Sequence, residues 1–170
     1  MIRATAGTIL LLCLAGCVQP TRDQEIAPAV EQVDEVILRV PVSPLRNVGG
    51  GAGPDAVLLE VFCGKRDRGG GVAVSGALEV LFFDGAVPAE DVPGAKPFHV
   101  EKFPNSLLRG NPNSRLREGY STFFGVSYQG VVPWGPKSPS GTKITLVARY
   151  VPPAGPPVLS DPTVVTLRPS

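Results

Sequence analysis

Only a few side chains in this 170-residue chain could take part in catalysis, and they stand far apart in the sequence. His99 is the single histidine, which excludes a histidine-rich metal site and obliges any Ser-His-Asp triad to use it. No G-x-S-x-G sequence exists to hold a nucleophilic serine. A single histidine in a strand is usually a half-exposed surface residue. We therefore expect no catalytic residue and no enzyme activity.

Cys63 is the second candidate, because a thiolate is a strong nucleophile. Three basic residues follow it closely and could lower its pKa, namely Lys65, Arg66 and Arg68. Cys63 also continues the two-residue apolar spacing that begins at Val57, and this pattern predicts a side chain in the core. We expect a buried and unreactive thiol.

Sites for phosphate or metal have little support. The segment Gly64–Gly71 is basic and rich in glycine, but it lacks the G-x-x-x-x-G-K-[ST] order of a phosphate-binding loop. It predicts a solvated strand connection, with contact to anionic headgroups or envelope polymers as a minor alternative. The acidic pairs Asp34-Glu35 and Glu90-Asp91 are sequence neighbours, whose side chains point apart in an extended chain, and no calcium-loop motif is present. No metal site and no cofactor are predicted.

Aromatic residues of the C-terminal half could stack on sugar rings if they lay on one exposed face. Most of them alternate with small polar residues and are predicted to pack in the core or in loops: Tyr120, Phe123, Phe124 and Tyr128. Trp134 lies between Pro133 and Gly135, which predicts an exposed loop. Trp134 is therefore the candidate ligand-binding residue.

The first seventeen residues carry a different chemical signal. Arg3 precedes the apolar stretch 4–15, which is too short for a spanning helix of roughly 20 residues. The tetrapeptide Leu14-Ala15-Gly16-Cys17 resembles the lipobox of bacterial lipoprotein precursors. That resemblance implies a signal peptide at residues 1–16, cleavage before Cys17, and lipidation of Cys17 by a diacylglyceryl thioether and acyl chains such as palmitate. The alternative is an ordinary secretory signal in which a cysteine follows small residues.

These features predict an exported protein that is held to a cell-envelope membrane by lipid on Cys17. Two or three acyl chains hold firmly where one is marginal, since each buried CH₂ contributes roughly 0.8 kcal/mol. Val18 follows the cysteine, where an Asp is the inner-membrane retention signal of enteric-type lipoproteins. We therefore favour the outer membrane, on its periplasmic or its surface face.

The mature chain would be electrically neutral. Cleavage would remove Arg3, one of 16 basic residues, and leave 15 basic residues against 15 acidic ones. A neutral exported chain gives no support for nucleic-acid binding. Residues 17–33 contain few large apolar side chains and two prolines, so they are predicted to be a flexible tether. The alternative is that part of this segment packs on the domain as an irregular first strand.

Residues 34–170 are predicted to form one domain. From Glu35 onward apolar residues recur at every second position, which is the spacing of β-strands, and glycine and proline separate these runs. Seven strands are predicted, over 35–42, 57–63, 78–83, 98–103, 122–128, 144–150 and 163–167. One turn of helix is predicted over 105–109, and a stiff connection over 152–157. The pattern is typical of an all-β fold, a single antiparallel β-sandwich of about seven strands, immunoglobulin-like or related in topology.

Residues 56–167 carry a further resemblance. Its elements are, in order, GALEVLFFD at 76–84, Phe103-Pro104, Ser114-Arg115-Leu116 leading to Tyr120, Pro133-Trp134, ITLVARY at 144–150, and LSDP at 159–162. Together they resemble a family of small secreted or lipid-anchored β-sandwich proteins numerous in planctomycete-type bacteria. This chain departs from that pattern by glycine-rich insertions at 49–53 and 69–71. The resemblance implies a fold and a cellular location, because the family has no assigned activity and no catalytic residues to transfer.

The sequence thus predicts a lipid-anchored cell-envelope protein whose non-enzymatic β-sandwich serves protein interaction or structural support. The alternative is a carbohydrate- or envelope-polymer-binding module that uses Trp134 and neighbouring loops. The predicted partners are the membrane, through the lipid on Cys17, and an envelope protein or polysaccharide.

Overall fold

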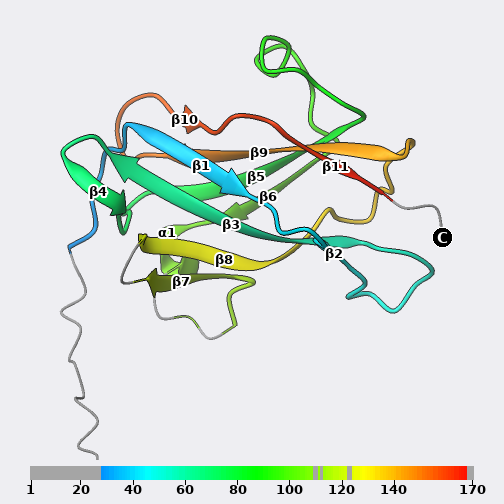
Figure 1. Cartoon of the computed structure of the whole chain (residues 1–170), viewed down its shortest axis with the longest axis horizontal. Helices are drawn as coiled ribbons and strands as arrows, with labels where there is room; N and C mark the ends of the chain where they lie inside the picture. The colour runs from blue at the N-terminus through cyan, green and yellow to red at the C-terminus, as the bar shows by residue number, and fades with distance from the viewer. Residues whose placement is uncertain (1–27, 109–110, 112, 122–123, 168–170) are drawn as a thin grey trace, which may run out of the picture.

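The computed structural model of the chain describes residues 28–108, 111, 113–121 and 124–167. In this part of the chain nearly all regular structure is β, arranged in two sheets, and Figure 1 shows the sheets as two layers. The predicted turn of helix is present as α1 (Asn105–Leu108). The predicted signal peptide and Cys17 lie outside the described residues. Within those residues, no helix has the length and apolar character needed to cross a membrane.

The first sheet is built around a long central strand. Its six strand segments are β1 (Glu35–Arg39), β2 (Leu45–Arg46), β3 (Ala56–Lys65), β4 (Arg68–Gly71), β7 (Leu116–Ser121) and β8 (Gly125–Pro133). One edge of β3 pairs antiparallel with β1 and β2, and the other edge pairs antiparallel with β8 and β4. β7 pairs with β8 at the edge of the sheet. The long strands are therefore ordered β1-β3-β8-β7.

The second sheet has β9 and β5 at its centre. Its strands are β5 (Ala77–Asp84), β6 (His99–Phe103), β9 (Lys143–Val151), β10 (Val158–Leu159) and β11 (Thr163–Thr166). β9 pairs antiparallel with β5 over eight residues, and β6 pairs with the opposite edge of β5. β10 and β11 both pair with the other edge of β9. The order across this sheet is β10/β11-β9-β5-β6.

The core lies between the two sheets. Successive side chains of a strand point to opposite faces, so each strand contributes every second residue to it. Its largest members, all fully buried, include Tyr128, Tyr150, Phe82, Leu59, Leu78, Leu116, Ile144 and Leu146. Burying a large apolar side chain contributes roughly 1.5–3 kcal/mol, so this cluster is the main source of stability.

The predicted strands match the structure unevenly. Those over 57–63, 78–83, 98–103, 144–150 and 163–167 are present, with ends displaced by at most two residues. The prediction over 122–128 is wrong in its bounds, because the chain there forms the separate strands β7 and β8, and β8 continues to Pro133. The prediction over 35–42 is too long, since β1 ends at Arg39 and Val42 is fully exposed. Pro41 explains this end because proline has no N–H for a ladder hydrogen bond.

The end of the predicted tether packs on the domain, so a domain boundary at residue 34 is too late. We call residues 29–34 the strap. The Val30 N–H donates to the Ala73 carbonyl at 2.8 Å, and the Ser75 N–H donates to the Val30 carbonyl at 2.9 Å. Val33 is buried in the core. The structure therefore supports the alternative in which this segment acts as an irregular first strand.

The two glycine-rich insertions have structural explanations. A Cβ on Gly71 would lie 2.0 Å from the carbonyl oxygen of Val126, so only glycine lets β4 approach β8 this closely. In the other insertion, the Asp55 carboxylate accepts the N–H groups of Val48 and Gly49, each at 2.7 Å. The loop after β2 is thereby closed on the start of β3.

Candidate functional site

The two sheets differ in what covers their outer faces. The connection between β5 and β6, which projects at the top of Figure 1, folds over the outer face of the second sheet. There Val92 packs with Leu81, Phe83 and Val147 in a separate small core. The outer face of the first sheet carries no such cluster in the described part of the chain. We call this surface the open face, and it is the candidate site.

A row of polar residues crosses the open face. Strand register places Arg39 on β1 opposite Glu60 on β3, Glu60 opposite Gln129 on β8, and Gln129 opposite Arg117 on β7. Directly opposed residues share one face of a sheet, so the four side chains form a continuous row. The Gln129 side-chain amide donates to Glu60 at 2.9 Å, which fixes the middle of the row. Arg39, Gln129 and Arg117 are exposed.

Apolar side chains lie on both sides of this polar row. Register pairs Ile37 with Phe62 on one side and Leu58 with Val131 on the other. Ile37 is 39% exposed and Phe124, which lies just before β8, is 52% exposed. The open face is therefore banded, with apolar rows flanking a polar one.

Arg39 joins the polar row to the aromatic residues. Its guanidinium carbon lies 4.8 Å from the ring centre of Phe62 and 5.4 Å from that of Phe124. The two rings meet edge to face, with centres 6.5 Å apart. Cation–π contacts of this kind contribute roughly 0.5–1 kcal/mol at exposed sites, so they hold the arginine close to the rings. The result is a preformed patch in which Arg39 and Phe124 are exposed, and Phe62, only 7% exposed, supports them from below.

Two hollows lie on the open face and share Gln129 as a wall. The larger, of about 500 Å³, is bounded by Val48, Arg115, Arg117 and Val131 among others. The smaller, of about 380 Å³, lies between the end of β1 and the outer side of β3 and includes Arg39, Pro41 and Leu58. Both are open surface depressions. They suit side chains of a partner better than an enclosed small molecule.

Trp134, the candidate for sugar stacking, is not exposed. It follows β8 outside regular structure, as predicted, but its side chain is only 3% exposed and belongs to the main core. Its backbone N–H donates to the Asp55 carbonyl at 3.2 Å. The expectation of an exposed ring is wrong because the flanking proline and glycine predict a loop but carry no information about burial.

His99 is a partly buried residue on the edge strand β6, close to the expected half-exposed position. Its Nε2 atom lies 3.1 Å from a carboxylate oxygen of Glu101, and Arg115 lies 3.8 Å from the other oxygen. The imidazole ring also packs against Phe82, with ring centres 5.7 Å apart. Because Arg115 precedes β7, this ion cluster connects the edge of the second sheet to the first sheet.

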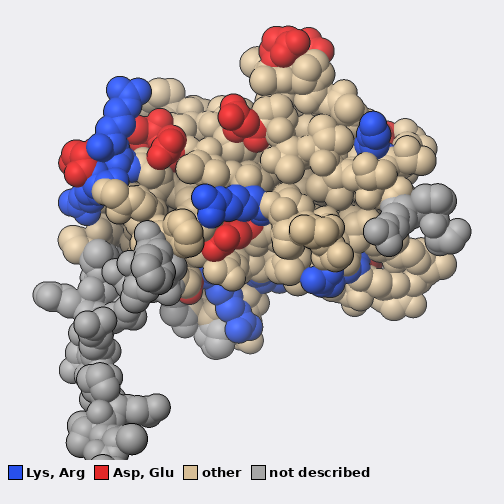
Figure 2. Space-filling view, viewed as in Figure 1, with Lys and Arg blue, Asp and Glu red and all other residues tan. Residues whose placement is uncertain are grey.

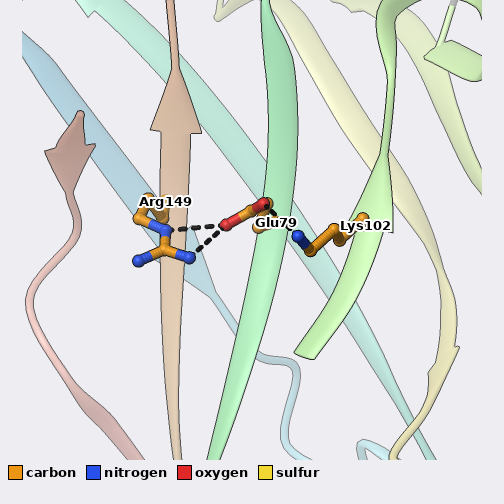
Figure 3. Close-up of polar contacts among 3 residues, drawn as sticks. All are labelled: Glu79, Lys102 and Arg149. Atoms are coloured by element: carbon orange, nitrogen blue, oxygen red, sulfur yellow. Dashed lines mark hydrogen bonds and ion pairs between the residues drawn. The ribbon is translucent and has the colours of Figure 1, made fainter. Parts of the chain in front are cut away.

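A second ion cluster crosses the outer face of the second sheet, and Figure 3 shows its three members on adjacent strands. Glu79 on β5 is only 7% exposed. Its carboxylate accepts from Nε of Arg149 on β9 at 2.7 Å and also from the terminal Nη2 of the same guanidinium. Lys102 on β6 lies 3.6 Å from the other carboxylate oxygen. This cluster satisfies a buried charge and cross-links three strands.

Cys63 is fully buried and unpaired in the core, as predicted. Burial raises the pKa of its thiol to about 12, because the charged thiolate loses hydration there. The basic residues that follow it, such as Arg66, lie on the exposed turn between β3 and β4. The thiol is therefore protonated at neutral pH and shielded from reagents.

Substituting Cys63 by serine is expected to lower the free energy of unfolding by about 1–3 kcal/mol, because a buried hydroxyl loses its hydration.

The raised pKa of Cys63 means that the folded state binds the thiol proton more tightly than the unfolded state does. This contribution of the thiol to stability is complete below its ordinary pKa of 9.0 and decreases as the pH rises toward 12. Urea titrations between about pH 8 and 11 should show a smaller alkaline loss in Cys63→Val than in the parent. Rapid labelling of the native thiol would contradict this prediction.

In the described part of the chain, no three His, Cys, Asp or Glu side chains gather as a metal site would require. No family model, no curated protein and no solved structure matches this chain. The open face is therefore judged on its own geometry. Sequence reasoning missed it, although the alternation in β1 and β3 contained a signal: Ile37, Leu58 and Phe62 are apolar at positions that should face solvent.

Proposed function

We propose that this chain is a lipid-anchored protein of the cell envelope whose domain binds a protein partner through the open face, without enzymatic activity. In this proposal the chain is exported and cut before Cys17, and lipid on Cys17 holds it to a membrane, with the outer membrane favoured. The lipobox at residues 14–17 supports the anchoring part.

We also propose that the domain has an immunoglobulin-like topology. The order β1-β3-β8-β7 in one sheet and β11-β9-β5-β6 in the other corresponds to the A-B-E-D and G-F-C-C′ order of such sandwiches. Folds of this kind host binding, adhesion and catalysis, so the topology supports an interaction role only together with a suitable surface.

The Arg39–Phe62–Phe124 patch is the observation that carries the interaction proposal. Arginine and aromatic residues are enriched in the centres of protein interfaces, where each contributes strongly when water is excluded. Here the patch is already held in place by cation–π contacts, so little side-chain freedom is lost on binding. The smaller hollow, which Arg39 lines, can receive a partner side chain beside the patch.

Photo-crosslinking in intact cells tests this proposal. A benzophenone amino acid at Ile37 is expected to capture one discrete protein, and a matched probe at Val164, which is 47% exposed on the second sheet, is expected to capture little. Arg39→Ala should reduce the Ile37 product about tenfold, the effect of losing roughly 1.4 kcal/mol of binding energy. Cys17→Ala serves as the unanchored control.

Other outcomes would contradict the proposal. Equal products from Ile37 and Val164 would show random collision, and an Ile37 product unaffected by Arg39→Ala would place the contact elsewhere. Recovery of envelope polysaccharide alone would favour a polymer-binding module, although the buried Trp134 ring could not then supply the stacking surface.

A further inference from the structure

The strap fixes the point at which the domain is attached to whatever precedes it. Besides the two backbone bonds of Val30, the Tyr150 hydroxyl donates to the Glu31 carbonyl at 2.7 Å and accepts the Gly76 N–H at 3.2 Å. The Asp34 N–H donates to the Gly64 carbonyl at 2.9 Å. These contacts bind the strap to three segments at one end of the sandwich, namely residues 73–75, the end of β3 and the end of β9.

We call this the strap end. It contains the turn between β3 and β4, residues 72–76, and the connection between β9 and β10, all of which lie toward the left in Figure 1. The loop after β2 and the connection between β8 and β9 lie at the opposite end, which we call the far end. Strand β3 runs from one end to the other, and its ten residues span about 33 Å.

The chain between the lipidation site and the strap is short. Cys17 and Pro28 are eleven residues apart in sequence, and eleven residues reach at most about 40 Å when fully extended. The strap end must therefore stay within that distance of the membrane surface. The far end can lie farther from the membrane by the length of β3, about 33 Å.

We infer that the strap gives the domain a preferred polarity on the membrane: the strap end lies nearer the bilayer than the far-end loops do. This inference rests on the proposed lipidation of Cys17. With this polarity the open face stands at an angle to the bilayer and stays accessible along its length.

Charge does not produce this polarity. The strap end carries three basic residues and four acidic ones, namely Lys65, Arg66 and Arg68 with Glu31, Asp34, Glu35 and Asp67. Figure 2 shows both signs together at this end, on the left of the view. A mixed surface has no strong attraction for anionic headgroups, so added salt should leave the arrangement unchanged.

Energy transfer from the domain to the membrane tests the inference on the full, lipidated chain. Cys63 is buried and Cys17 would carry lipid, so a single introduced cysteine can be labelled specifically. Donor dyes are placed at Asp67→Cys on the strap end, Gln129→Cys at mid-sheet and Ser138→Cys on the far end, in vesicles of phosphatidylethanolamine and phosphatidylglycerol with an acceptor on the headgroups. We expect the donor-to-membrane distance to increase in that order, by up to about 30 Å overall, in low and in high salt.

A strap variant provides the matched control. Val30→Pro removes the N–H that binds the Ala73 carbonyl and should loosen the strap, so the distances from positions 67 and 138 should converge. Circular dichroism is used to check whether this variant is folded. If it is not, Tyr150→Phe removes the hydroxyl that binds the Glu31 carbonyl and serves instead.

The readouts separate the two proposals. Failure of the parent chain to float with vesicles, together with an unmodified Cys17 by mass spectrometry, would refute the anchoring. Flotation with equal distances at positions 67 and 138, or with the reverse order, would refute the polarity alone. Distances that change with salt would show that surface charge, not the strap, sets the orientation.

Discussion

Replacing Trp134 by alanine is expected to lower the free energy of unfolding by about 3–5 kcal/mol, the usual cost of removing a large aromatic side chain from a core. Trp134 is 3% exposed and packs within the main cluster between the sheets. The cost arises from lost apolar burial and from the cavity that the smaller side chain leaves. Urea denaturation followed by circular dichroism measures it, because the variant lacks the only tryptophan of the chain and has no useful intrinsic fluorescence.

Val42→Ala is the matched control, since Val42 is apolar but fully exposed and should change stability by no more than about 0.5 kcal/mol. An unchanged stability in Trp134→Ala together with lost polysaccharide binding would mean that the ring is accessible to ligand in solution. That result would restore the carbohydrate-binding alternative.

Strand positions could be predicted well wherever one face of the strand packs against the other sheet and the opposite face does not. β9 is the clearest case: Ile144, Leu146, Ala148 and Tyr150 all enter the core. The alternation exists because one side faces the other sheet, so the sequence pattern is a direct consequence of burial. β5 was found equally easily, even though its outward residues Leu81 and Phe83 are apolar and lie under the β5–β6 connection.

The errors arose where a long-range contact overrides the local pattern. β8 continues through Gly130, although this glycine interrupts the apolar alternation. Only glycine fits there, because a Cβ would lie 1.7 Å from the Arg115 carbonyl oxygen of the neighbouring chain segment. The strap was assigned to the tether because its partners, Ala73 and Tyr150, lie more than forty residues away. The spacing of nearby residues reveals neither how closely two strands approach each other nor which distant residue a segment contacts.

The candidate site illustrates the same limit more strongly. Arg39, Glu60, Gln129 and Arg117 become a row only after the register of four strands is known. A shift of one residue in any pair would send a charged side chain into the core, so burial selects the register. The sequence shows which residues alternate, but only the fold shows which of them meet.

Arg149→Ala is expected to lower the free energy of unfolding by roughly 3 kcal/mol, at the lower end of the range for breaking a buried ion pair. It leaves the Glu79 carboxylate, which is 7% exposed, without the guanidinium that accounts for most of its hydrogen bonding. Lys102 remains near the other oxygen, but its side chain is 69% exposed and screened by water. Urea denaturation at neutral pH measures the loss.

Two comparisons separate charge from packing at this site. Lys102→Ala should cost less than about 1 kcal/mol, as exposed ion pairs do. The double substitution Glu79→Leu with Arg149→Leu should be less destabilising than Arg149→Ala, because it removes the buried charge along with its partner. Equal losses from Arg149→Ala and Lys102→Ala would show that water reaches Glu79 directly. In that case an unpaired carboxylate at this position would not be costly, and the cluster would contribute little to holding β5 between β9 and β6.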